Sequence, residues 1–153
     1  MEAESSTSGV PGAGQVPGVL GALDSLTSAI VAADRGIAQL QAGRELLLAM
    51  AVELSHGLID DTGPGVPADE GLWEARAVEL AERSVAAEIA TATRTSDRAI
   101  QHQMGAAVEL VERFPATLQA FSQGRISAAH VRVIRDAGTV IEDPAARARY
   151  EAA

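Results

Sequence analysis

A long heptad repeat in the first third of the chain constrains the fold more than any other sequence feature. Apolar residues recur from Leu23 to Leu58 in alternating steps of three and four. This spacing places them on one side of an α-helix of roughly 50 Å, since a helix rises about 1.5 Å per residue. We call this set of positions the seam, in which Arg44 is the one exception to the apolar pattern: Leu23, Leu26, Ile30, Ala33, Ile37, Leu40, Arg44, Leu47, Ala51, Leu54 and Leu58.

The seam has two interpretations, and the sequence leaves both open. In the first, the long helix packs its seam against the rest of the same chain, as in an intramolecular bundle. In the second, residues 23–58 form a coiled coil between two copies of the chain, and Arg44 extends into solvent or pairs with an acid of the partner. The contact residues of such a homodimer would be Leu26, Ile30, Ile37, Leu40, Leu47 and Leu54.

The composition favours helices throughout. Hydrophobic residues make up 47% of the chain and aromatic residues only 3%; much of the apolar share is alanine, the best helix former. We therefore predict an all-α fold, with a long N-terminal helix packed on a helical bundle that contains a helix-turn-helix-like hairpin. Residues 19–153 would form a single domain, after a disordered lead at 1–18 that is rich in glycine, serine and proline.

Proline, glycine and capping residues predict where the helices begin and end. Residues 60–71, with two prolines and four acids, predict a loop, and residues 72–93 the next helix. In that helix we expect an inward stripe that includes Leu80 and Trp73, with Trp73 packed on the long helix. Later boundaries are expected at Phe114-Pro115, Gly124, Ser127 and Asp143-Pro144.

Residues 84–112 predict two helices joined by a short turn. Ser96 can cap the second helix by accepting a hydrogen bond from an orphan backbone N–H, and Ile100 and Met104 would be buried. Arg94 stands at the turn position where a helix-turn-helix prefers glycine, because glycine takes a positive φ without strain. The hairpin therefore resembles a helix-turn-helix, with Arg94 as a departure from the usual pattern.

Polar residues on the outer side of the second hairpin helix are the candidates for DNA contact. In DNA-reading proteins this face enters the major groove, where arginine recognises guanine and glutamine recognises adenine. The candidates are Arg94, Arg98, Gln101 and His102, with Arg132 and Arg135 of a later helix as further phosphate contacts. The alternative is that these residues form an ordinary solvated helix surface.

The distribution of charge restricts DNA binding to one region. The net charge is −9, so the chain as a whole is a poor binder of polyanions. Between residues 83 and 135, however, seven arginines stand against four acids. Only this region can approach phosphates without repulsion.

Several functional classes lack the residues they need. The chain has no cysteine, which excludes disulfides and thiolate metal sites. His56, His102 and His130 lack metal-ligand spacing, and no catalytic motif is present, so we expect no metal, no cofactor and no enzymatic activity from this chain alone. No apolar run is long enough for a membrane span, and the acidic N-terminus is not a signal peptide. We expect a cytoplasmic protein.

Two segments resemble a known family. They read SVAAEIATATRTSDRAIQHQM and ERFPATLQAFSQGRISAAHVRVI, and they resemble the actinobacterial domain of unknown function 222 family, also called the 13E12 repeat family. The resemblance covers the chain from about Leu23 onward and is most specific over residues 114–134. It implies a helical N-terminal region that family members follow with a C-terminal HNH endonuclease domain.

An HNH site needs histidines and an orienting asparagine, and the chain contains no asparagine. The resemblance therefore implies a part in DNA processing without nuclease activity in this chain. The helix that begins at Pro144 meets no stop signal, so we expect a family domain that is truncated at its C-terminus. A DNA-associated helical module and a dimerising scaffold both remain open.

Overall fold

The computed structural model describes residues 16–60 and 70–152, and the described part is built of helices without a strand. The helices are α1 (Val16–Asp60), α2 (Glu70–Thr93), α3 (Asp97–Arg113), α4 (Pro115–Ser122), α5 (Ala128–Gly138) and α6 (Pro144–Glu151). The predicted all-α class is therefore confirmed. The predicted lead at 1–18 and the predicted loop at 60–71 lie almost entirely outside the described residues.

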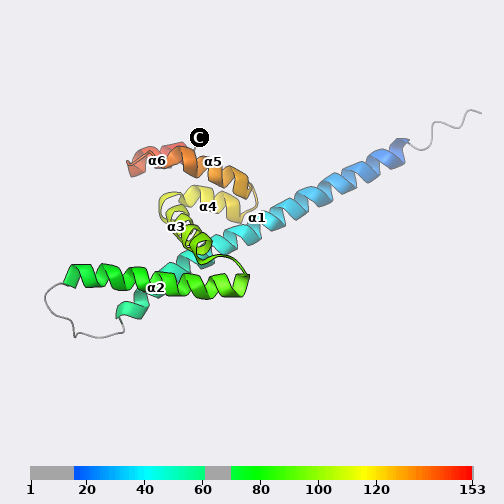
Figure 1. The fold of residues 1–153 in the computed structure, drawn as a ribbon. Coiled ribbons are helices and arrows are strands. Elements are labelled where there is room, and N and C mark those ends of the chain that lie inside the picture. The colour runs from blue at the N-terminus through cyan, green and yellow to red at the C-terminus, as the bar shows by residue number, and fades with distance from the viewer. Residues whose placement is uncertain (1–15, 61–69, 153) are drawn as a thin grey trace, which may run out of the picture. The chain divides into compact units, whose positions relative to one another are not determined.

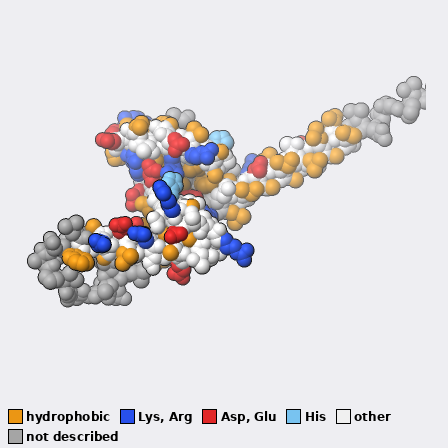
Figure 2. Space-filling view, in the orientation of Figure 1, with side chains coloured by type: hydrophobic (Ala, Val, Ile, Leu, Met, Phe, Trp, Pro, Cys, Tyr) orange, Lys and Arg blue, Asp and Glu red, His pale blue; other side chains and the backbone are white. Residues whose placement is uncertain are grey.

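The chain divides into two units, Met1–Asp34 and Arg35–Ala153, which we describe separately. In the first unit the structure describes the beginning of α1, where the side chains of residues 18–34 are all exposed. Hydrophobic side chains line the visible face of this helix (Figure 2). Its large exposed apolar residues are Val19, Leu20, Leu23, Leu26, Ile30 and Val31.

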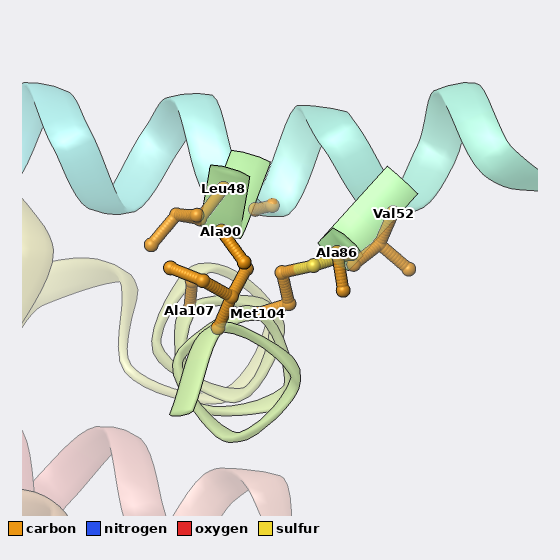
Figure 3. Packing of buried hydrophobic residues seen from close by; sticks show 8 residues of the cluster. Leu48, Val52, Ala86, Ala90, Met104 and Ala107 are labelled. Carbon is orange, nitrogen blue, oxygen red and sulfur yellow. The ribbon is translucent and has the colours of Figure 1, made fainter. Parts of the chain in front are cut away.

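In the second unit, α3 lies between α2 and the group formed by α4, α5 and α6 (Figure 1). A first core cluster joins the later part of α1 to α2 and α3 (Figure 3). Its buried members are Leu48, Ala49, Val52, Ala86, Ala90, Ile100, Met104 and Ala107. A second cluster joins α1 and α3 to the C-terminal helices through Ala38, Ala42, Leu110, Phe114, Phe121 and Val131. The predicted packing of the long helix on a bundle thus holds for residues 38–55.

The face of α1 that packs in this unit is not the seam. Alanines at 38, 42 and 49 line the buried side, where their small side chains let neighbouring helices approach closely. The seam residues Leu40, Leu47 and Leu54 remain 78%, 67% and 68% exposed, and Ile37 is 52% exposed. The intramolecular interpretation of the seam is therefore wrong for these residues.

The first half of α2 also departs from the prediction. Trp73 and Leu80, expected to face inward, are exposed. Helix α2 instead buries Ala86 and Ala90, which pack against α3, the helix that follows the tight turn. Apolar residues recur at helical spacing along α2 beyond the part that packs on α3. This spacing alone therefore predicted a buried Trp73, although Trp73 lies outside the packed part.

The expected capping residues shape the ends of the later helices. Gly124 ends α4 with a φ of 67°, while the N–H of Arg125 donates to the carbonyl of Ala120 over 2.9 Å. The Asp143 carboxylate accepts from the N–H groups of Ala145 and Ala146 at the start of α6.

Helix α4 has no side-chain cap from the residue that precedes it. Glu151 of α6 supplies one instead: its Oε1 accepts from the N–H of Thr117 over 2.8 Å and from the Thr117 hydroxyl over 2.7 Å. The first turn of α4 is thereby tied to the last turn of α6.

Candidate association and nucleic-acid surfaces

The turn between α2 and α3 gives the hairpin its geometry. Arg94 takes a φ of 55°, so the departure from glycine seen in the sequence does not prevent the left-handed turn. The N–H of Thr95 donates to the carbonyl of Ala90 over 2.9 Å, which closes the end of α2. Ser96 then caps α3 by accepting from the N–H of Ala99. The arginine backbone bears a strain that glycine would not.

Four of the six DNA candidates lie at this turn or in the first two turns of α3. Arg94, Arg98, Gln101 and His102 are all exposed. Within the described residues, no hydrogen bond or ion pair engages the side chain of Arg94, Arg98 or His102. We call these four residues the hairpin face.

The hairpin face is not strongly cationic. Across residues 84–105 the two arginines are balanced by Glu88 and Asp97, and Asp97 lies in the first turn of α3, where an acid suits the helix dipole. The positive balance seen in the sequence comes mainly from arginines further along the chain. The local field therefore gives only weak attraction for a polyanion.

The other two candidates, Arg132 and Arg135, differ in whether the fold engages their side chains. Arg132 is exposed on α5. Arg135 is engaged in the fold, because its guanidinium contacts the Glu109 carboxylate at 2.7 Å and its Nε is buried without a hydrogen-bond partner among the described residues. We therefore leave Arg135 out of any phosphate-binding surface.

Glu109 on α3 joins two helices and the segment after α5. Besides Arg135 it pairs with Arg113 at 3.2 Å and accepts from the Thr139 hydroxyl at 3.2 Å. Burial raises the pKa of Glu109, but the hydrogen bond and charge of Arg135, with Thr139 and Arg113, outweigh burial and lower its pKa overall. The contacts of Glu109 with Arg135 and Thr139 could not be predicted from the sequence, because these residues lie 26 and 30 positions away.

A second polar pair lies at a cavity between α1, α2 and α3. His56 Nε2 contacts Glu82 Oε1 at 2.9 Å, beside a cavity of about 330 Å³. The remaining residues that line it are Val52, Glu79, Arg83, Gln101, Met104, Gly105 and Val108. None of these described residues carries a hydroxyl or thiol nucleophile, and the described residues contain no cluster of three or more metal-ligating side chains.

His130 completes the cap of α5. Its Nδ1 lies 2.7 Å from the Ser127 hydroxyl and accepts from the Ser127 N–H, in the place where a glutamate usually closes a capping box. The side chain is exposed. Its position is explained by helix capping rather than by a ligand.

The apolar seam is the other surface that the fold leaves open. In the second unit it comprises Ile37, Leu40, Leu47 and Leu54 around Arg44, whose guanidinium donates to Gln103 Oε1 of α3. Exposed apolar patches of this kind occur at protein–protein contacts, at membrane contacts and in ligand-binding grooves. None of the helices in the described part is both long and apolar enough to cross a membrane.

A comparison with protein families matches residues 34–153 to the model named Domain of unknown function (DUF222). The chain belongs to the DUF222 family. No curated protein and no solved structure matches this DUF222 chain. The family match begins at the boundary between the two units, so the first four seam residues lie ahead of it.

Proposed function

We propose that this DUF222 chain is a non-catalytic helical module that joins two copies of itself along the seam of α1. One observation carries the proposal: α1 buries an alanine face in its own bundle and leaves its heptad face exposed. Heptad spacing is the pattern by which helices of separate chains interlock. The family resemblance further supports a scaffold role beside an HNH-type nuclease domain carried elsewhere.

The apolar area is of the right order for association. Ile37, Leu40, Leu47 and Leu54 of two copies give eight side chains, each contributing about 1.5 kcal/mol on burial. The resulting gain of about 12 kcal/mol falls within the association cost of about 4–15 kcal/mol. These four positions alone therefore give a marginal dimer, and Leu23, Leu26 and Ile30 of the first unit would make it stable.

Light scattering on the purified chain tests the proposal. The wild type should have twice the mass of the 15.8 kDa monomer, and Leu40→Asp should be monomeric, because it places a charge in the apolar contact. Val140→Asp is the matched control, since Val140 is 80% exposed and lies between α5 and α6, away from the seam. A monomeric wild type at high micromolar concentration would refute self-association.

A second candidate function, DNA contact through the hairpin face, is favoured by the exposure of Arg94, Arg98, Gln101 and His102. With a balanced local charge, binding would be weak and strongly dependent on salt. Arg94→Ala with Arg98→Ala should reduce the slope of log affinity against log salt by about 1.8 if both contact phosphates. Arg149→Ala, at an exposed arginine of α6, is the control. If fluorescence anisotropy at low salt shows no duplex binding, this function is excluded.

A further inference from the structure

We infer that the two copies of α1 pair in antiparallel orientation, with Ile37 of one copy level with Leu40 of the other. This inference rests on the proposed self-association and specifies how the partner, a second copy of this chain, is placed. The heptad frame runs without interruption through α1, Val16–Asp60. Arg44 is the one charged residue of the seam, and it distinguishes a parallel from an antiparallel pair.

Arg44 disfavours a parallel pair. The residue is exposed and stands at a seam position between the apolar residues Leu40 and Leu47. In a parallel, in-register coiled coil each seam residue meets its own equivalent, so two arginine guanidinium groups would share one layer. Like charges at that distance repel, and no acid occupies a neighbouring seam position to offset them.

An antiparallel pair in the stated register supplies a partner for Arg44. Ile30 then lies level with Leu47, Leu26 with Ala51, and Leu23 with Leu54 of the second copy. Arg44 lies level with Ala33, the smallest seam residue of that part of the helix, and beside Asp34 of the second copy. This register thus pairs Leu26 with Ala51 and Arg44 with Ala33, and it places a guanidinium beside a carboxylate at both symmetry-related places.

Other antiparallel registers lack this complementarity. A shift of one heptad in either direction places Arg44 beside Thr27 or beside Gln41 of the second copy, where no acid is available. Within the described residues Asp34 is exposed and makes no ion pair with its own chain. Arg44 uses one of its five N–H donors on Gln103, so donors remain for a carboxylate.

Charge exchange tests the pairing of Arg44 with Asp34. Arg44→Glu and Asp34→Arg, each alone, should raise the dimer Kd about tenfold by creating two like-charged contacts. The double variant Arg44→Glu with Asp34→Arg should return the Kd to within about threefold of wild type, since the pairs re-form with reversed charges. A double variant as weak as the sum of its single changes contradicts the inference.

Cross-linking tests the orientation directly, because the chain has no cysteine of its own. A mixture of Leu26→Cys and Ala51→Cys, treated with a short bis-maleimide, should give covalent dimers. Leu26→Cys alone should give none, because its two copies would lie about 38 Å apart along the helices. Covalent dimers of Leu26→Cys alone would show a parallel pair.

Light scattering on the same samples distinguishes a failure of the antiparallel orientation from a failure of the proposed self-association. A dimer that cross-links in parallel overturns the orientation and leaves the proposed function standing. A monomeric wild type overturns both. A dimer that forms normally but shows neither cross-linking pattern places the contact away from the seam, and this also overturns the inference.

Discussion

Among the described residues, Arg94 and Gly124 take a positive φ at the end of a helix, and only Gly124 is a glycine. Gly124 takes a φ of 67°, and a Cβ added there would lie 2.9 Å from the carbonyl oxygen of Arg35. We expect Gly124→Ala to lower the free energy of unfolding by about 2 kcal/mol, from backbone strain and the close contact. Gly105→Ala, where a Cβ meets nothing within 4 Å, should instead raise it by up to about 1 kcal/mol. Urea unfolding measures both, and equal effects would contradict the argument.

Arg94 should show the opposite response to substitution. Its φ of 55° disfavours any residue with a Cβ, so Arg94→Gly should raise the free energy of unfolding by about 1 kcal/mol. Arg94→Ala removes the same charge and keeps the strain, so it should leave stability nearly unchanged. If calorimetry finds the two variants alike, the turn is not strained.

At the scale of helices, the carboxylate of Glu109 links α3 to α5 and makes stability depend on pH. The pKa of Glu109 in the folded chain is below its ordinary value of 4.5. Its contribution is therefore fully present above pH 4.5 and is lost as the pH falls through the lower, folded pKa. Glu109→Gln should destabilise the chain at pH 7 by about 1.5–3 kcal/mol, and this difference should shrink at acid pH in urea titrations. A difference that is constant with pH would show that the charge of Glu109 is not involved.

Glu45 on α1 makes stability depend on pH in the opposite sense to Glu109. Burial raises its pKa, while the charges of Arg44 and Arg135 lower it by less. Its contribution is therefore largest below pH 4.5 and is lost as the pH rises through the raised, folded pKa. Glu45→Gln should stabilise the chain at pH 7, in contrast to Glu109→Gln. A loss of stability at pH 7 would contradict the assignment.

The sequence predicted most helix boundaries, because proline, glycine and capping residues act on their immediate neighbours. Ser96, Gly124, Ser127 and Asp143 all stand at helix ends as expected. It did not predict which side of α1 is buried, since a heptad repeat looks the same whether its partner is in the same chain or in another. The engagement of Arg135 by Glu109 was equally hidden, because it joins residues brought together only by the fold.

At the scale of the whole molecule, self-association should make thermal unfolding depend on protein concentration. When folding and association are coupled, mass action raises the Tm as the chain is concentrated. Circular dichroism melts across a hundredfold concentration range should show this rise for wild type and for Val140→Asp. Leu40→Asp should melt at one temperature throughout. A constant Tm for the wild type would argue against a dimer coupled to folding.

The bond between Glu151 and Thr117 has a practical consequence for anyone who shortens this chain. Removing the last three residues deletes Glu151 and leaves the opening amide of α4 without its acceptor. Hydrogen–deuterium exchange at Thr117 should then accelerate, although that amide is 34 positions away in the sequence. A trimmed variant would therefore report damage in the interior of the bundle rather than at its cut end.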